Sequence, residues 1–215
     1  MTSRLTPHFL VLTLASSLFT GACGEREKPM TSADSQAAHV REVVAAGGVV
    51  DSILPIEEQL RRFRADLSEH PDTLRHASAS IDALVKRWGK AIASSDTAEL
   101  NAMTLDRAEY AWLYYPGSKL SKPPYEAPPQ LLWGQILSTS GEGTHKLLSR
   151  FGGKRFVIEK VLCPAASDTT ASSLVYSDCR VRVHGGDEKA FTDRLFGSII
   201  EHQGRFKFLG YANGQ

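Results

Sequence analysis

The chain has 215 residues, with 25 Lys and Arg against 24 Asp and Glu, so its formal net charge at pH 7 is +1. Nucleic-acid binding rests on an excess of Lys and Arg against phosphates, so this balance gives no electrostatic case for a nucleic acid or a charged membrane surface as partner. The length fits one domain of about 150 residues behind a leading segment. A domain of that size buries roughly 70% of its unfolded surface and needs no metal to hold it.

The first 22 residues have the pattern of a secretion signal. Their apolar run at residues 9–19 is shorter than the about 20 residues that a membrane-spanning helix needs. Small residues follow it and lead to Cys23. This segment resembles the lipobox of bacterial lipoproteins, with Ala22 before the cysteine and Gly24 after it, although Thr20 stands where that family usually has Leu.

The lipobox resemblance implies cleavage before Cys23 and acylation of that cysteine, which anchors the protein in a membrane of the cell envelope. The domain would then face the periplasm or the cell exterior. The alternative is an ordinary signal peptide cut nearby, which leaves Cys23 in the discarded piece or as a free thiol. Gly24, rather than Asp, follows the cysteine, and in a double-membraned bacterium this is compatible with sorting to the outer membrane.

Residues 23–40 are small and polar, and their composition predicts a flexible tether with little apolar surface to bury. Residues 41–78 form a predicted helical extension. Within it, apolar residues recur at spacings of three and four over residues 53–67, which predicts an amphipathic helix with Pro55 in its first turn. The apolar stripe is interpreted as core, and a partner protein or a lipid surface is the alternative.

Three further helices are predicted in the middle of the chain. Residues 81–92 have an apolar face and a charged face, as in a main core helix. Asp96 with Glu99, and Asp106 with Glu109, have the spacing of capping boxes and predict two helix starts. The second of these helices carries a cluster of aromatic residues.

A stretch with five prolines, residues 116–129, is predicted to be an extended loop. A helical region follows, and Pro129 suits its first turn. We expect the glycines at 141 and 143 to interrupt this region and those at 152 and 153 to end it.

Alternating apolar and polar residues predict a hairpin between residues 155–163 and residues 173–184. With Cys23 acylated, the remaining cysteines are Cys163 and Cys179, and an oxidising compartment favours a disulfide between them. Two buried thiols are one alternative. The other alternative is that the two cysteines form half of a metal site, but the sequence has no C-x-x-C and no His at the spacing of metal ligands. The predicted cross-strand pairs are Cys163 with Cys179, Val161 with Val181, and Glu159 with Val183.

A second hairpin is predicted over residues 195–211, with a two-residue turn at Gln203 and Gly204. This turn sets the register. It places Ile199 opposite Phe208 and Glu201 opposite Phe206.

Helices first and antiparallel strands last predict an α+β domain, with the helices packed on one face of a curved antiparallel sheet. Residues 79–215 are similar to the NTF2-like, or SnoaL-like, superfamily. The resemblance rests on the helix Ala83-Leu84-Val85-Lys86-Arg87-Trp88, on the Ser94-Ser95-Asp96-Thr97 segment after it, and on the closing hairpin at residues 199–209. It implies a cone-shaped domain that in some members binds a ligand and in others catalyses isomerisation or cyclisation.

Motifs for chemistry are absent from the sequence: it has no G-x-S-x-G, no H-E-x-x-H, no complete P-loop and no G-x-G-x-x-G. Neither a metal nor a cofactor is therefore expected. The histidines are scattered, and His184 and His202 are expected on a solvated strand face.

Enzymes of the superfamily place an acid or base inside the cone, where desolvation shifts its pKa. The predicted registers put Glu159 and Glu201 on the otherwise apolar face, which makes them the catalytic candidates, with a phenol from Tyr110 or Tyr114 as a partner. The alternative is that both carboxylates lie near strand ends and turn to water. Tyr110, Tyr114 and Trp133 could also line a pocket for a small apolar ligand, and the alternative is that they form core.

Three functions are consistent with these features. The first is a lipid-anchored, exported protein whose domain binds a ligand or an envelope protein without catalysis. The second is an isomerase or hydrolase, which needs Glu159 or Glu201 buried in a deep pocket. The third is a structural component of an envelope assembly, which needs an exposed apolar stripe on the helix at residues 53–67.

Overall fold

The computed structural model describes residues 32–48, 54–169, 172–185 and 189–211. The predicted signal peptide and Cys23 lie outside the described residues. The chain forms two compact units, Met1–Ser52 and Ile53–Gln215. Among the described residues, no helix combines the length and the apolar composition that crossing a membrane requires.

The described part of the first unit is a helix, α1 (Ser32–Ala45). The flexible tether predicted for residues 23–40 is therefore wrong for its second half, which is helical. Alanine, the residue with the highest helix propensity, is the most frequent residue in α1.

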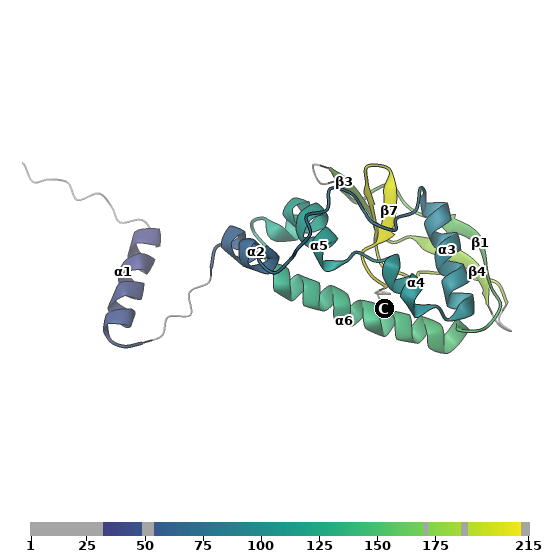
Figure 1. Cartoon of the computed structure of the whole chain (residues 1–215), viewed down its shortest axis with the longest axis horizontal. Helices are drawn as coiled ribbons and strands as arrows, with labels where there is room; N and C mark the ends of the chain where they lie inside the picture. The colour runs from purple at the N-terminus through teal and green to yellow at the C-terminus, as the bar shows by residue number, and fades with distance from the viewer. Residues whose placement is uncertain (1–31, 49–53, 170–171, 186–188, 212–215) are drawn as a thin grey trace, which may run out of the picture. The chain divides into compact units, whose positions relative to one another are not determined.

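The second unit has an α+β fold, as predicted (Figure 1). Its helices are α2 (Ile56–Arg64), α3 (Ile81–Ser94), α4 (Thr97–Ala102), α5 (Arg107–Glu109), the π-helix η1 (Tyr110–Tyr114), the 3₁₀ helices η2 (Tyr115–Gly117) and η3 (Lys119–Ser121), and α6 (Pro129–Phe151). Its strands are β1 (Phe156–Leu162), β2 (Asp168–Thr169), β3 (Ser173–Tyr176), β4 (Arg180–Gly185), β5 (Phe191–Asp193), β6 (Ile199–His202) and β7 (Arg205–Phe208).

The strands form two antiparallel sheets and not the single curved sheet that was predicted. One sheet has the order β1-β4-β5, and the other has the order β2-β3-β6-β7. Figure 1 shows α3 beside β1 and β4, and α6 running along one side of the unit.

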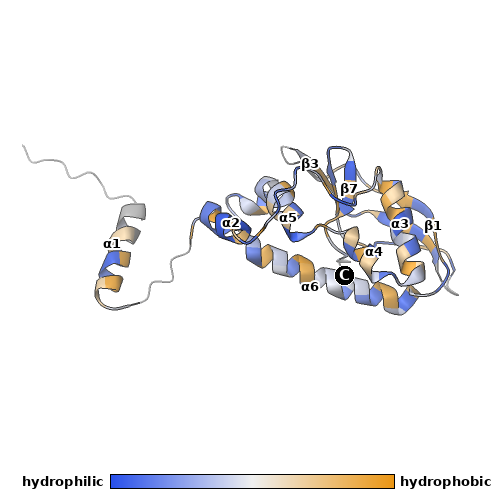
Figure 2. Cartoon of the chain, viewed as in Figure 1, coloured by the Kyte–Doolittle hydropathy of each residue, from blue (hydrophilic) through white to orange (hydrophobic). Residues whose placement is uncertain are grey.

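The core helix α3 is capped by Ser80, whose side chain accepts a hydrogen bond from the backbone N–H of Ala83. Figure 2 shows hydrophobic and hydrophilic residues side by side along α3, as its amphipathic pattern predicts. Trp88 is fully buried between Phe156 and Phe196, with which it makes edge-to-face contacts. A Cβ atom at Gly89 would lie 2.9 Å from Ile158, so glycine allows α3 to approach β1 closely.

Both predicted helix starts at acidic residues are confirmed. Asp96 accepts a hydrogen bond from the N–H of Glu99 at the start of α4. Asp106 and Glu109 form a complete capping box at the start of α5. The carboxylate of Glu99 binds the guanidinium of Arg87 and so ties α4 to α3, and this hydrogen bond holds the pKa of Glu99 below its usual value.

The predicted interruption at residues 141–143 is wrong, because α6 is continuous from Pro129 to Phe151. A glycine inside a helix costs about 1 kcal/mol, and burial of one large apolar side chain offsets more than that. Leu147 and Phe151, which lie beyond these glycines, are both buried in the core. The predicted end is confirmed, since Gly152 follows the last helical residue and Gly153 has a positive φ of 70°. The proline-rich stretch before α6 contains short 3₁₀ turns where an extended loop was predicted.

The first predicted hairpin is only partly correct. β1 pairs with β4 and places Val161 opposite Val181, as predicted. Residues Ser173–Tyr176, however, form β3 of the other sheet and pair with β6. The chain therefore leaves the first sheet after β1, adds β2 and β3 to the second sheet, and returns with β4.

The predicted disulfide between Cys163 and Cys179 is present, with a Cα–Cα distance of 4.2 Å. It joins the end of β1 to the residue before β4. The loop that it closes contains β2 and β3, so the disulfide fixes the two crossings of the chain between the sheets.

The second hairpin has the predicted register, with Ile199 opposite Phe208 and Glu201 opposite Phe206. Gln203 and Gly204 both have positive φ, as a two-residue hairpin turn requires. The outer edge of β7 is also hydrogen-bonded, since Phe206 bonds with Ser78 and the backbone of Phe208 bonds with residues 103 and 105.

Replacing both disulfide cysteines, Cys163→Ser with Cys179→Ser, should lower the free energy of unfolding by about 3 kcal/mol, because the unfolded chain regains the entropy of a loop of this size. Urea unfolding of the oxidised protein and of the variant measures the difference. Wild-type protein in reductant is the control and should unfold like the variant. Equal midpoints for oxidised wild type and variant would show that the bond does not stabilise the fold.

Candidate functional site

The first catalytic candidate, Glu159, is not on the apolar face. A β-bulge between Ile158 and Lys160 shifts the register, so Ile158 and not Glu159 lies opposite Val183. The Glu159 side chain is exposed, and its Oε2 accepts a hydrogen bond of 2.8 Å from Nε of Arg182. The prediction for Glu159 is wrong because one extra residue reverses which face a side chain occupies.

The second candidate, Glu201, lies opposite Phe206 as predicted but at the end of its strand. It is half-buried, and its two oxygens accept hydrogen bonds from the Tyr176 hydroxyl at 3.2 Å and from the Gly204 N–H at 3.3 Å. Burial, and then the hydrogen bond to Glu201, raise the pKa of Tyr176. Glu201 thus stabilises its own turn, and neither carboxylate is the deeply buried group that the enzyme hypothesis requires.

The three residues proposed for an apolar pocket belong to a packed aromatic cluster. The Tyr110 side chain is fully buried, and its hydroxyl donates a hydrogen bond of 3.0 Å to the backbone oxygen of Pro129. Its ring centroid lies 5.1 Å from that of Trp133 and 6.0 Å from that of Tyr114. Burial raises the pKa of the Tyr110 hydroxyl well above its ordinary range. Tyr110 therefore acts as core, which was the alternative considered from the sequence.

The same cluster covers the apolar stripe of α2. Phe63 is 5% exposed and packs edge-to-face on Tyr110, and Leu60 and Leu67 pack around them. The envelope-assembly hypothesis needs this stripe to be exposed. Over the described residues of α2, the protein's own core occupies it.

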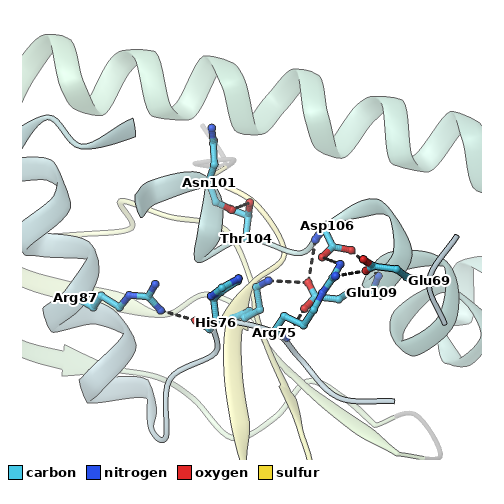
Figure 3. A network of polar contacts seen from close by, with 9 residues as sticks. Glu69, Arg75, His76, Arg87, Asn101, Thr104, Asp106 and Glu109 are labelled. Atoms are coloured by element: carbon cyan, nitrogen blue, oxygen red, sulfur yellow. Dashed lines mark hydrogen bonds and ion pairs between the residues drawn. The ribbon is translucent and has the colours of Figure 1, made fainter. Parts of the chain in front are cut away.

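A fully buried ion pair lies between the closing hairpin and α5. Nζ of Lys207 lies 2.7 Å from Oε2 of Glu109, and their side chains are 2% and 0% exposed. Glu109 also accepts hydrogen bonds from the N–H groups of Arg75, at 2.5 Å, and Asp106, at 3.0 Å. Figure 3 shows Glu69, Arg75, Asp106 and Glu109 gathered in one network, in which the guanidinium of Arg75 binds both Glu69 and Asp106.

This ion pair is a structural element because solvent does not reach it. A charge held away from water costs several kcal/mol unless a partner and further hydrogen bonds compensate it. Here every oxygen of Glu109 has a donor. A buried titratable pair is a candidate for catalysis only where a substrate can reach it. Because the side chains of Lys207 and Glu109 have almost no exposed surface, a substrate cannot reach this pair.

His202 is buried, so its predicted solvated position is wrong; His184 is exposed, as predicted. Nδ1 of His202 lies 2.8 Å from Oγ of Ser173, and Nε2 lies 3.1 Å from the backbone oxygen of Asp72. Ser173 and His202 are 3% and 4% exposed, so the serine hydroxyl is not accessible to a substrate as a nucleophile. This pair joins β3, β6 and the segment before α3.

A cleft of about 340 Å³ lies where the chain crosses between the two sheets. Its walls come from α6, from the β3–β4 and β5–β6 connections and from the segment after β7. We call it the seam cleft. Its lining residues are Ile136, Thr139, Ser177, Asp178, Arg194, Gly197, Ser198, Leu209 and Gly210. The volume falls within the about 300–1,000 Å³ of small-molecule sites.

The seam cleft has both polar and apolar walls. The guanidinium of Arg194 forms an ion pair with Asp178. The hydroxyls of Ser177 and Ser198 are 3.1 Å apart. Leu209 supplies an apolar side. Small-molecule sites combine apolar walls with a few placed polar groups in this way.

A second cleft, of about 590 Å³, lies beside α2 and is lined in part by Phe63, Asp66 and Arg107. Its charged side chains Arg107 and Asp66 pair with each other. The guanidinium of Arg107 binds Asp66 and the backbone oxygen of Phe63, and it lies over the Phe63 ring. Both terminal nitrogens of the Arg107 guanidinium are used in these contacts, whereas in the seam cleft only Nη1 of Arg194 has a partner among the described residues. The seam cleft is therefore the better candidate for a ligand.

Within the described ranges, no three His, Cys, Asp or Glu residues are grouped so that they could hold a metal ion. Comparison of the chain with protein family models, curated proteins and solved structures finds no match.

Sequence reasoning did not find the seam cleft. Its polar residues share no motif, because they lie in two connections that are separated by two strands, β4 and β5: Ser177, Asp178, Arg194 and Ser198. Only local features of the sequence could have pointed to these residues. Asp178 immediately precedes a disulfide cysteine, and Arg194 directly follows a strand.

Breaking the buried ion pair should strongly destabilise the fold. Lys207→Met and Glu109→Gln should each lower the free energy of unfolding by about 3–5 kcal/mol, since each leaves a buried group uncompensated. The double variant should lose clearly less than the sum of the two, because the groups act on each other. Urea unfolding of the four proteins measures this coupling.

The exposed pair Arg182 and Glu159 is the matched control. Arg182→Met should change stability by under about 1 kcal/mol, as is usual for surface ion pairs. Additive losses at Lys207 and Glu109 would contradict the assigned role of the buried pair.

Proposed function

We propose that the protein is an exported, lipid-anchored protein whose α+β domain binds a small molecule without catalysing a reaction. The lipobox-like segment ending at Cys23 supports export and anchoring. The disulfide between Cys163 and Cys179 is consistent with an oxidising compartment. The proposed location is the cell envelope, with the domain facing the periplasm or the cell exterior.

The observation that carries the binding function is the seam cleft. It has the volume of a small-molecule site, and its walls combine paired charges, hydroxyls and apolar side chains. The carboxylates considered for catalysis occupy other positions: Glu159 is paired with Arg182, and Glu201 is bonded to its own turn. A binding module fits this arrangement better than an isomerase or hydrolase.

Membership of the NTF2-like superfamily is part of the same proposal. It is supported by α3 packed on β1 and by a closing hairpin with the predicted register. The predicted cone has a single curved sheet, whereas this unit has two separate sheets. The proposed fold is therefore a variant of the cone that is open between the two sheets.

The binding function is tested with the full-length protein, expressed with its own leader in a double-membraned bacterium and extracted in mild detergent. Native and denaturing mass spectra of the purified protein are compared. We expect an added mass in the native spectrum that is lost on denaturation. The variant Thr139→Trp should abolish it, because the indole fills the seam cleft from an exposed position on α6.

The matched control is Leu137→Trp, which places the same indole on an exposed position of α6 that does not line the seam cleft. It should retain the added mass. A purified protein without an added mass, or an added mass that Thr139→Trp leaves unchanged, would contradict ligand binding in this cleft. A second protein retained in its place would favour an envelope partner.

The anchor is tested by Cys23→Ser in the same host. The variant should move from the membrane fraction to the soluble fraction and lose incorporation of labelled fatty acid, because the thiol that carries the acyl chain is missing. Cys163→Ser, which leaves the lipobox intact, is the control and should keep the label. Wild-type protein that is unlabelled and soluble would show that the leader is an ordinary signal peptide.

A further inference from the structure

We propose that the seam cleft binds a monocarboxylate, with Arg194 as the residue that recognises the carboxylate group and with Leu209 against the apolar part of the ligand. This inference rests on the proposed binding function and specifies its ligand class. Four features of the cleft support it.

The first feature is the free hydrogen-bonding capacity of Arg194. Its Nη1 donates to Oδ1 of Asp178, and its backbone N–H donates to Asp193. Among the described residues, Nε and Nη2 of Arg194 have no partner. A guanidinium carries five N–H donors in a planar fork that matches the two oxygens of a carboxylate. The edge formed by Nε and Nη2 is therefore available for a bidentate contact.

The second feature is the charge balance. Arg194 and Asp178 are the charged residues that line the seam cleft, and together they are neutral. A ligand with one negative charge makes the site singly negative, whereas a dianion such as a phosphate monoester adds a second charge beside Asp178. The charge balance therefore favours a monocarboxylate over a dianion.

The third feature is a chain of hydroxyls that ends in the cleft. Oγ of Ser167 lies 3.0 Å from Oγ of Ser177, which lies 3.1 Å from Oγ of Ser198. The Ser167 hydroxyl has two acceptors within reach, Oγ of Ser177 and the backbone oxygen of Val175 at 3.2 Å. When it donates to Ser177, Ser177 donates to Ser198, and the hydrogen of Ser198 is free for a ligand oxygen. The chain can thus supply a neutral donor besides the guanidinium.

The fourth feature is the apolar wall. Ile136 of α6 and Leu209 after β7 line the cleft beside Gly210. A Cβ atom at Gly210 would lie 3.3 Å from Cβ of Ser140 and 3.7 Å from Ile136, so glycine lets this wall close against α6. An apolar ligand body can pack on this wall while its carboxylate contacts Arg194.

The probes are 2-naphthoate and its neutral amide, 2-naphthamide, titrated into the full-length protein in detergent and followed by calorimetry. We expect naphthoate to bind at least about tenfold more tightly than naphthamide, because charge-assisted hydrogen bonds are about twice as strong as neutral ones. Thr139→Trp should abolish binding of naphthoate, which assigns it to the seam cleft.

Two substitutions with opposite expected effects on naphthoate binding test the roles of the Arg194 and Asp178 charges. Arg194→Gln should weaken naphthoate binding by about 10- to 100-fold, because the charged donors are lost. Asp178→Asn should strengthen it by about fivefold, because a negative charge beside the ligand is removed. Asn also tolerates the positive φ of 58° at this position. Neither substitution should change the binding of naphthamide.

The outcomes separate this inference from the proposed function. If naphthamide binds as tightly as naphthoate and Arg194→Gln has no effect, the cleft binds ligands but the carboxylate assignment is wrong. If neither probe binds at millimolar concentration, the assignment is also wrong. An added native mass that Thr139→Trp removes would still support the proposed function in both cases.

Discussion

The buried ion pair between Lys207 and Glu109 is the constraint on which the arrangement of this domain depends. The closing hairpin is covered on both faces. One face carries Ile199 and Phe208 into the main core, and strand alternation then places Lys207 and Ile200 on the other face, which is also buried. A buried ammonium requires a carboxylate with its own hydrogen bonds, so Glu109 and the backbone donors around it have to lie where they do. The pair thus fixes α5 and the segment before α3 against the hairpin.

The position of the seam cleft follows from this fixed hairpin. Ser198 immediately precedes β6 and Leu209 immediately follows β7, so both are held by the ends of the hairpin. On the other side, the disulfide at Cys179 holds the connection that contains Ser177 and Asp178. The cleft is therefore made of loop residues whose neighbours in the chain are strands or a cross-link. Loops positioned by a rigid scaffold in this way commonly carry binding sites.

Local features of this fold were predictable from the sequence and its long-range arrangement was not. The turn at Gln203 and Gly204 determines the hairpin register, and the acidic caps determine the starts of α4 and α5, because each depends on residues within one turn. Alternation identifies a strand but not its partner, so it predicts one strand at residues 173–184, whereas this segment belongs to two sheets. The burial of His202 depends on the segment before α3, which contacts it through Asp72, and alternation does not show that contact either.

If the seam cleft binds a monocarboxylate as proposed, the ion pair of Arg194 and Asp178 means that it does so without a strongly positive surface. An unpaired arginine would attract any anion, whereas Asp178 neutralises the site and leaves directional hydrogen bonds as the source of selectivity. Asp178 is the more exposed partner, and its positive φ turns the chain at the point where it leaves the second sheet. The same residue thus shapes the crossing between the sheets and orients the guanidinium. In the proposed site, Asp178 lies in the crossing that forms the cleft, and its carboxylate offsets the positive charge of Arg194.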